Sequence, residues 1–533
     1  MKTLLKNGKI YDGSGNSSFI GDILIDDDII LEVANHIDES KADKIIDITN
    51  LSISSGFIDG HSHNDWFAIK NNPIPYFEPF VRQGMTTYIT GNCGLSATGF
   101  NDDCQYIDKM GGGLFSFNDT TGEYGSTSKY FETIDQNCPG NIVSLVGHCS
   151  ARAAVSGFAN RKLTLEEENE MLRILEKSLQ EGAAGISLGL MYEPGLYAQK
   201  EELRKIVELC VKYDKPLTVH PRANSAVSMA YPQLLGRSHL LRAVDELVEI
   251  SKGTNLKLHY SHAIFVGRRS FKNKDEFIEI INKLREEGID AQFDIYNETK
   301  GVSVITVILP AWYQSMTLEQ KRKFTTKFKL SLLVKASSLL LGFGFKDIEV
   351  AYIGKGYEKY EGKTIYQIAK EEKSSCLKTY LKMCELSNFK GRVNMGPYST
   401  PEIISQFEKD DRCLFMSDAW VEEFGIQNPA IYDCYPKFLR DAKLGTGDTM
   451  EKTIRKMSGA IADRFGLIKR GYIKNGYYAD LTIFDEEEIK NAIPDQEKSF
   501  GIKKVFINGK LVLDDEKLNA ELFRTCGRAL PIK

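Results

Sequence analysis

Short apolar runs, rich in β-branched residues, recur along the chain, and each ends in polar or glycine-rich sequence. Eight of these runs have the length of a β-strand. We predict strands at residues 51–58, 86–90, 142–146, 185–188, 217–220, 256–261, 291–295 and 413–417.

Most of these runs are followed by a segment with apolar residues at helical spacing. Residues 164–181 begin with the capping residue Thr164 and an acidic first turn, and then repeat apolar positions with a helical period. Residues 201–213, 243–252 and 274–287 behave alike. Strands that alternate with helices form parallel βαβ units. We therefore predict the α/β class and a closed (β/α)8, TIM-like barrel.

Three regions depart from this alternation. The two ends of the chain hold short β-like runs and turn signals such as Asn7-Gly8, and we predict that residues 1–54 and 471–533 together form a small β-sandwich domain. The barrel then spans residues 55–470. Residues 301–411 are lysine-rich, have helical periodicity and are too long for one βα connection, so we predict an inserted subdomain over the mouth of the barrel.

Composition narrows the class of protein. With 533 residues, 42% of them hydrophobic, the chain can bury a large core. The net charge of −5 is close to balance for this length, so we expect neither a nucleic-acid nor a membrane partner. We identify no targeting segment and no stretch of about 20 apolar residues. The ten scattered cysteines fit reduced thiols better than a disulfide scaffold. We expect a cytoplasmic protein with a small-molecule substrate, and homo-oligomer formation stays open.

Residues that can bind a metal stand at the ends of several predicted strands. His61 and His63 lie one residue apart after the first strand, and alternation along an extended chain can turn both toward one point. Active sites of such barrels lie at the C-terminal strand ends, and histidine, thiolate and carboxylate are ligands of zinc. Each residue alone has a structural explanation, but together they predict a metal site. The remaining members are Cys93 after the second strand, His220 and His262 at the fifth and sixth, and Asp418 at the eighth.

The chain resembles members of the amidohydrolase superfamily, and most closely the N-acyl-D-amino-acid deacylases, the D-aminoacylase family. The shared motifs run nearly from end to end of the sequence. They include Gly56-Phe57-Ile58-Asp59-Gly60-His61-Ser62-His63, Gly91-Asn92-Cys93-Gly94, Gly189-Leu190-Met191-Tyr192-Glu193-Pro194-Gly195, His220-Pro221-Arg222, Ser261-His262, Ser417-Asp418 and Ala479-Asp480-Leu481.

The resemblance implies a role for each residue of the metal site. Cys93, His220 and His262 would bind the tighter zinc ion. His61 and His63, with Cys93 as a bridge and Asp418, would form a second, weaker position. Zinc would lower the pKa of a coordinated water and polarise the scissile carbonyl. Asp418 would take the water's proton and pass it to the leaving nitrogen. The implied function is zinc-dependent hydrolysis of a non-peptide C–N bond, either deacylation of an N-acyl amino acid or hydrolysis of a related amide.

The positions that would hold the substrate depart from the family pattern. Ile264, Ala430 and Glu298 stand where the resemblance implies a lysine, an arginine and a tyrosine that bind the substrate carboxylate. Because two positive charges are lost and a negative one is gained, we expect a substrate that lacks this carboxylate or presents it elsewhere. Tyr192 is a further candidate for substrate contact, and Arg222 is a candidate for a relocated carboxylate clamp.

Two other interpretations of the metal site stay open. A deaminase or a cyclic amidase would use the same histidines and Asp418, although a nucleobase deaminase has no need of Cys93. The fourth strand ends without the lysine that hydantoinases and dihydroorotases carbamylate. A barrel that keeps its metal only as a binding protein is the third hypothesis. The complete set of candidate ligands, with Asp418 among them, argues against it.

Overall fold

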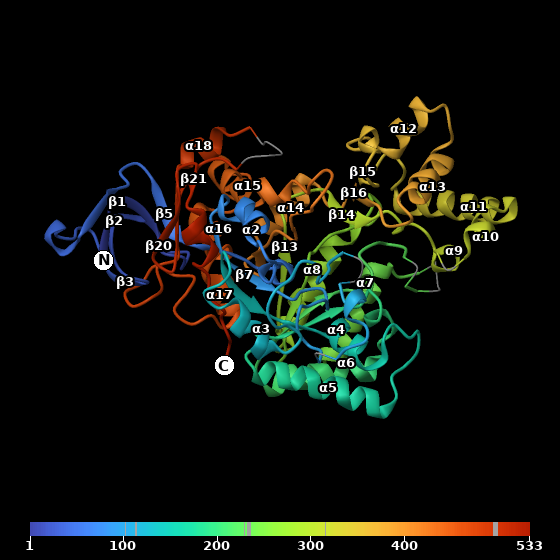
Figure 1. Ribbon diagram of the computed structural model, residues 1–533, viewed down its shortest axis with the longest axis horizontal. Helices are drawn as coiled ribbons and strands as arrows, with labels where there is room; N and C mark the ends of the chain where they lie inside the picture. The colour runs from blue at the N-terminus through green and yellow to red at the C-terminus, as the bar shows by residue number, and fades with distance from the viewer. Residues whose placement is uncertain (102, 112–113, 229, 232–235, 315, 494–498) are drawn as a thin grey trace.

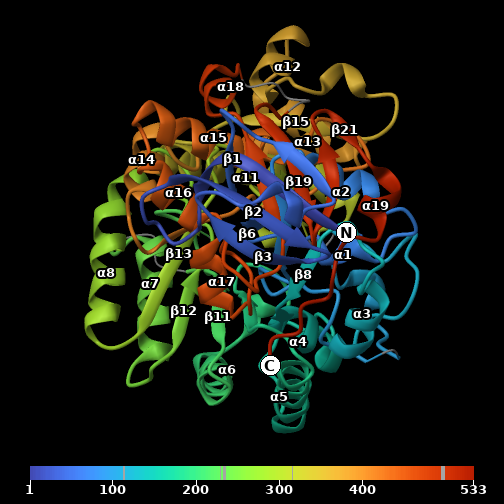
Figure 2. The ribbon, with the colours of Figure 1, turned by 90° about the vertical axis from the view of Figure 1, so that its left-hand side faces the viewer.

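The computed structural model describes residues 1–533 except 102, 112–113, 229, 232–235, 315 and 494–498 (Figure 1). Parallel strands alternate with helices through most of the chain. A separate, largely antiparallel sheet brings together strands from the two ends of the sequence. Figure 2 views the molecule from the side of this sheet, whose strands β1, β2 and β3 lie in front.

The parallel strands form two sheets, β6-β7-β8 and β9-β10-β11-β12-β13-β17. Only Leu145 separates β8 from β9, and the backbone N–H of Gly60 donates to the carbonyl of Phe415 (3.2 Å), which joins the ends of β6 and β17. This α/β arrangement is consistent with the predicted barrel. The strands are β6 (Phe57–Asp59), β7 (Met85–Thr90), β8 (Asn141–Ser144), β9 (Val146–Gly147), β10 (Ile186–Gly189), β11 (Pro216–His220), β12 (Lys257–Tyr260), β13 (Asp290–Ile295) and β17 (Cys413–Phe415).

Helices follow these strands where the periodicity predicts them. In α5 (Leu165–Gln180), Thr164 and Glu167 form a reciprocal capping box, and Met171, Leu175 and Leu179 are buried. The predicted segment 243–252 begins four residues earlier in the structure, at His239. The others are α1 (Asp65–Ala68), α2 (Ile74–Val81), α3 (Thr127–Ile134), α4 (His148–Ser156), α6 (Lys200–Lys212), α7 (His239–Ser251), α8 (Lys274–Glu286), α15 (Ala430–Leu444), α16 (Met450–Lys456), α17 (Gly459–Phe465), α18 (Glu486–Asn491) and α19 (Ala520–Arg524).

The terminal sheet has nine strands, and β18 joins its two halves by pairing antiparallel with β5, so that Thr482 lies opposite Ser54. Its core contains Ile10, Ile53 and Ile483. The strands are β1 (Lys2–Tyr11), β2 (Phe19–Asp26), β3 (Ile29–Ala34), β4 (Lys44–Asp47), β5 (Ser52–Ser55), β18 (Leu481–Phe484), β19 (Ile502–Ile507), β20 (Lys510–Asp514) and β21 (Lys517–Leu518).

The prediction of one strand over residues 51–58 is wrong, because the run divides at Gly56. The residues before Gly56 form β5 in the terminal sheet, and those after it form β6 in a parallel sheet. A Cβ atom on Gly56 would collide with the side chain of Thr86, so the close approach of the chain to β7 requires glycine.

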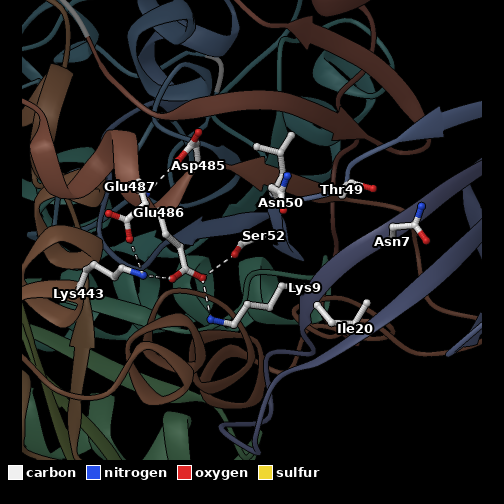
Figure 3. Close-up of a pocket in the computed structure, with 11 residues that line it drawn as sticks. Asn7, Lys9, Ile20, Thr49, Asn50, Ser52, Lys443, Asp485, Glu486 and Glu487 are labelled. Atoms are coloured by element: carbon white, nitrogen blue, oxygen red, sulfur yellow. Dashed lines mark hydrogen bonds and ion pairs between the residues drawn. The ribbon is translucent and has the colours of Figure 1, made fainter.

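A half-buried carboxylate links the terminal sheet to α15 and α18 (Figure 3). Glu486 accepts hydrogen bonds from Ser52 Oγ at 2.6 Å and Tyr11 Oη at 2.8 Å, and pairs with Lys9 Nζ at 3.0 Å and Lys443 Nζ at 2.7 Å. Although burial opposes the charged form, these donors lower the pKa of Glu486 to about 2. Glu486, Lys9, Ser52 and Lys443 line a surface hollow. Because the carboxylate already has its hydrogen-bond and ion-pair partners, we assign the hollow a structural role.

The region predicted as an inserted subdomain contains a small antiparallel sheet, β14-β16-β15, as well as the expected helices. Its elements are β14 (Gly301–Val304), α9 (Ala311–Gln314), α10 (Leu318–Arg322), α11 (Phe324–Leu341), β15 (Ile348–Tyr352), α12 (Ile365–Glu371), α13 (Cys376–Leu386), β16 (Arg392–Met395) and α14 (Pro401–Glu408). Within the described part of the chain, we find no helix with the length and apolarity needed to span a bilayer.

Candidate metal centre

The C-terminal ends of five parallel strands, β6, β7, β11, β12 and β17, bring six possible ligands together. These side chains form three overlapping groups, and within each group the ligand atoms lie within 4.8 Å of one another. The groups are His61, His63 and Cys93; Cys93, His220 and His262; and His61, His262 and Asp418.

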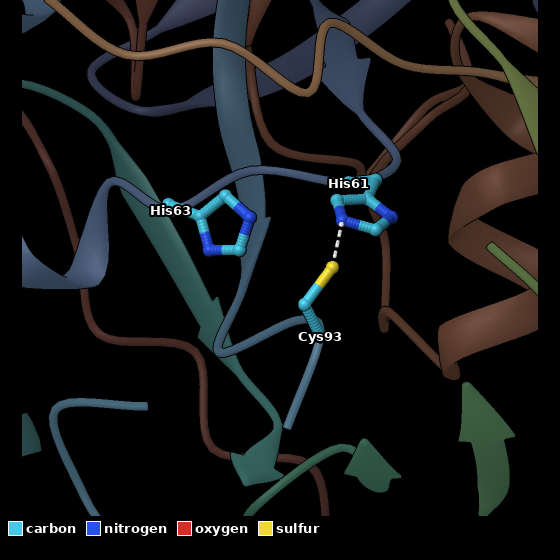
Figure 4. Close-up of side chains that lie close together, drawn as sticks. All are labelled: His61, His63 and Cys93. Carbon is cyan, nitrogen blue, oxygen red and sulfur yellow. Dashed lines mark hydrogen bonds between the residues drawn. The ribbon is translucent and has the colours of Figure 1, made fainter. Parts of the chain in front are cut away.

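Cys93 lies at the centre of this cluster. Its Sγ is 3.3 Å from His61 Nε2, 3.4 Å from His220 Nδ1 and 3.7 Å from His262 Nε2. Figure 4 shows the sulfur directed at the His61 ring, with the His63 ring to one side. Cys93 has a positive φ of 54°, in a tight turn after β7 that places its side chain among the histidines.

The donor atoms fit a bound cation. His220 Nδ1 and His262 Nε2 are only 2.7 Å apart, and both face the Cys93 sulfur. Burial lowers the pKa of both imidazoles, which favours the neutral rings whose nitrogens can offer lone pairs. Burial also raises the pKa of the Cys93 thiol, and a cation beside the sulfur would favour its thiolate. Two imidazoles and a thiolate are a donor set that zinc accepts.

Asp418 is the most accessible member of the cluster. Its Oδ1 lies 3.6 Å from both His61 Nε2 and His63 Nε2, and its side chain is 22% exposed, whereas the side chains of both histidines are nearly fully buried. The backbone N–H of Asp418 donates to the carbonyl of His61, which fixes the end of β17 against the end of β6. The carboxylate can therefore contact both the buried histidines and a substrate that approaches from outside.

Asp294, near the end of β13, belongs to this centre but was not predicted from the sequence. Its Oδ2 lies 2.8 Å from His259 Nε2 and 3.4 Å from His61 Nδ1, and its Oδ1 accepts the backbone N–H of His262. The carboxylate is 1% exposed and orients two candidate ligands at once. In the sequence, the only signal for this role was that Asp294 is the single acidic residue of the predicted strand 291–295.

Aromatic side chains surround the histidines. The His63 ring stacks on Phe115 at 4.9 Å between centroids and meets the edge of Trp420 at 5.6 Å. The Tyr192 ring lies 4.6 Å from the His220 ring. Tyr192 thus lies beside a candidate metal ligand, and its contact with substrate stays a prediction.

Arg222 does not supply the relocated clamp that the sequence suggested. Its guanidinium forms a bidentate pair with Glu246 at 3.0 and 2.9 Å. The same group also donates to the carbonyls of Leu196 and Ala198. These four bonds tie the segment after β11 to α7 and to the loop after β10, which gives Arg222 a structural role.

Two other predicted substrate positions have different surroundings. Ile264 is half-buried and packs against the core beside His262. Glu298 pairs with Lys437 Nζ at 3.2 Å, and this lysine also donates to the carbonyl of Asn297. Burial raises the pKa of Glu298, although Lys437 opposes the shift. The expected negative charge is therefore compensated by a lysine of α15, a contact that the sequence did not indicate.

Comparison with known proteins gives consistent results. Residues 436–512 match the model of the amidohydrolase family. The chain is 24% identical to D-aminoacylase of Alcaligenes xylosoxydans xylosoxydans over 537 residues, which covers 97% of this chain and 96% of the relative. It is also 24% identical to the N-acyl-D-aspartate deacylase of the same organism, covering 97% of this chain and 93% of that protein.

Solved structures agree on the fold. A structure of D-aminoacylase matches with a TM-score of 0.77 and 23% identity, covering 99% of both chains. The N-acyl-D-glutamate deacylase of Bordetella bronchiseptica, solved with zinc and a phosphonate inhibitor, matches with a TM-score of 0.77 and 20% identity, again covering 99% of both chains. These similarities confirm the predicted class of enzyme, a metal-dependent amidohydrolase. One segment of the chain matches the amidohydrolase family, and the chain is similar over nearly its whole length to D-aminoacylase and to the N-acyl-D-aspartate deacylase.

Proposed function

We propose that the protein is a zinc-dependent hydrolase that removes the acyl group from an N-acyl amino acid or a related amide. The observation that carries this proposal is the convergence of Cys93 Sγ, His220 Nδ1 and His262 Nε2 beside the partly exposed Asp418. Similarity to deacylases over nearly the whole chain supports the same class of reaction.

Cys93, His220 and His262 would hold one metal ion, and His61 and His63 would hold a second, weaker one that Cys93 and Asp418 share. The donor set favours zinc, and zinc is present in the similar N-acyl-D-glutamate deacylase structure. When bound, the metal supplies a Lewis acid that activates water and polarises the amide carbonyl.

Asp418 would act as the general base and then as the general acid. Its Oδ1 is held 3.6 Å from the Nε2 atoms of His61 and His63, and these rings lower the pKa of the carboxyl although burial opposes the shift. The charged carboxylate can accept a proton from the attacking water and deliver it to the leaving nitrogen. Replacement of Asp418 by Asn should lower kcat by about 10²–10⁴-fold while the ion held by Cys93, His220 and His262 is kept.

The substrate pocket would differ from that of a typical deacylase. Ile264 brings an aliphatic surface beside His262, Glu298 is paired with Lys437, and Arg222 is occupied by Glu246. None of these three side chains can therefore act as a cationic partner for a substrate carboxylate. We therefore favour an amide whose carboxylate is absent or blocked.

Paired substrates test the proposal. The zinc-loaded protein would be assayed with N-acetyl-D-amino acids and with the matching N-acetyl amines and amides that lack the free carboxylate. We expect faster turnover of the second set. Faster turnover of the acids would contradict the altered pocket but keep the deacylase chemistry. Activity on neither set, or activity that survives in Asp418→Asn, would contradict the proposed reaction.

We further infer that the two parallel sheets close into one (β/α)8 barrel of residues 55–470 with an insertion at 301–411. Residues 1–54 and 471–533 would form the small β-sandwich domain beside it. The Gly60–Phe415 bond and the short step at Leu145 support the closed barrel. All ten cysteines are free, which fits the reducing cytoplasm that we propose for this protein.

A further inference from the structure

Helix α11 exposes a stripe of large apolar side chains. One face of the helix is inserted in the fold, where Leu330 and Val334 are buried. The opposite face carries what we name the α11 stripe, with residues spaced by four, four and seven positions along the helix, so that they lie on one side. Its members and their exposed fractions are Phe324 (82%), Phe328 (58%), Leu332 (55%) and Leu339 (67%).

Positive charge is concentrated around this stripe. Residues 320–345 contain six lysines and arginines and no aspartate or glutamate. Lys335 is exposed and falls within the stripe by helical spacing, and Lys327 and Lys329 are exposed on its two flanks. No ion pair joins Lys327 or Lys335 to a carboxylate among the described residues, whereas Lys329 lies over the Trp312 ring at 4.6 Å.

Helix α11 projects from the molecule on the side opposite the terminal sheet (Figure 1). Its C-terminal end is anchored to the loop that follows β12. The carbonyl of Leu341 accepts the backbone N–H of Arg269 at 3.1 Å, and the carbonyl of Gly342 accepts Arg268 Nη1 at 2.9 Å. A helix that presents both apolar and cationic groups is therefore attached to the loop after β12, which contains His262.

We propose that the α11 stripe is a docking surface for an anionic lipid bilayer. Phenylalanine and leucine side chains on one face of a helix enter the boundary between headgroups and acyl chains, and neighbouring lysines contact anionic headgroups. The positive charge around the stripe favours an anionic bilayer over a second copy of the chain as its partner. Two copies joined through the stripe would bring Lys327, Lys329 and Lys335 against the same lysines, which repel one another. Because the net charge of the whole protein is close to balance, it does not reveal the positive charge around α11.

Vesicle binding by the full-length protein tests the proposal without reference to any enzymatic activity. We expect co-sedimentation with vesicles of phosphatidylcholine and phosphatidylserine, little with phosphatidylcholine alone, and release as salt concentration rises. The double variant Phe324→Ser/Phe328→Ser should weaken binding at least about tenfold, and Lys327→Glu/Lys335→Glu should do the same. These side chains are exposed, so the fold should be kept, which circular dichroism would verify.

A matched control is Leu165→Ser, since Leu165 is 71% exposed on α5, outside the stripe. This variant should bind vesicles like the unaltered protein. Equal binding by the stripe variants, or no binding to the anionic vesicles, would overturn the proposal. A dimer in analytical ultracentrifugation that the Phe324→Ser/Phe328→Ser variant loses would also overturn it, and would assign the stripe to a second copy of the chain.

Discussion

Cys93 is the residue on which the candidate metal centre depends most, because its sulfur lies within 3.7 Å of imidazole nitrogens from three different strand ends. Each of these imidazole nitrogens could instead form a hydrogen bond with another polar group. A soft anionic donor at their centre instead favours a shared cation. The strength of zinc binding should therefore follow this one side chain.

Replacement of Cys93 by Ser should lower zinc affinity at least about tenfold, because a neutral hydroxyl is a poor ligand compared with a thiolate. Zinc content after dialysis, measured by mass spectrometry, checks this. Cys210→Ser is the matched control, since Cys210 is buried on α6, outside the cluster. Unchanged zinc content in Cys93→Ser would contradict the bridging role.

Replacement of Asp294 by Asn should lower zinc affinity by about 10–100-fold although Asp294 is not among the candidate ligands. The carboxylate contacts the ring of His61 and the backbone of His262, and a neutral amide would orient both less firmly. Competition with a chromogenic chelator measures the change. Asp290→Asn, at the other end of β13, should leave zinc affinity unaltered. A similar loss in both variants would indicate general destabilisation instead.

The six possible ligands could be named from the sequence because each follows a predicted strand, and parallel strand ends meet in space. Asp294 and Lys437 could not be, because their importance comes from contacts between strands and helices far apart in the chain. Arg222 shows the reverse error. It stands two residues after His220 in the sequence, but its guanidinium pairs with Glu246, which is 24 residues away on α7.

At the scale of elements, the long periodic helices and the parallel strands between them were predictable, and the small sheet of the inserted region was not. Helix α5 matches its predicted range within one residue at each end because a capping box and a regular apolar face specify it. The sheet β14-β16-β15 was missed, since its strands have only four or five residues and β14 is half-buried throughout. The split of residues 51–58 depends on the contact between Gly56 and Thr86, which local sequence does not show.

Helix α14 carries a buried carboxyl whose titration should affect stability. Burial and the neighbouring Asp441 raise the pKa of Glu408 to about 8, against the opposing charges of Lys456 and Lys437. In the unfolded chain the group titrates near 4.5, so the folded protein binds the proton more tightly. This contribution to the free energy of unfolding is fully present below pH 4.5 and is lost as pH rises to about 8.

Replacement of Glu408 by Gln should therefore flatten the dependence of stability on pH across this range. Urea unfolding at a series of pH values measures the difference between the two proteins. Glu402→Gln, at an exposed position of the same helix, should keep the slope of the unaltered protein. A parallel slope in Glu408→Gln would contradict the raised pKa.

At the scale of the whole molecule, a buried polar network joins the terminal sheet to the parallel strands. Asp480 accepts hydrogen bonds from Arg470, from the backbone of Asn508 at 2.8 Å and from Asn141 Nδ2 at 3.1 Å. Asn141 begins β8, and Asp480 directly precedes β18. The family match over residues 436–512 includes this segment, although it lies far along the chain from the metal ligands.

Replacement of Asp480 by Asn should destabilise the protein by about 3–5 kcal/mol, because it leaves the buried Arg470 without its charged partner. The midpoint of urea unfolding reports the change. Asp514→Asn breaks an ion pair with Lys504 in which the Asp514 side chain is 53% exposed, and it should shift stability by less than about 0.5 kcal/mol. Equal effects of the two substitutions would show that the network does not join the two sheets.

The division of the chain at Gly56 has a consequence for synthesis. Strand β5 needs β18 as its neighbour, and Ser52 donates its hydrogen bond to Glu486, 434 residues further along the chain. On the ribosome, β5 therefore keeps an unpaired edge until almost the whole polypeptide has emerged, and contacts of such long range form slowly. His61 and His63 follow β6, the next strand after β5, so we expect the nascent chain to acquire its complete metal centre only after translation has ended.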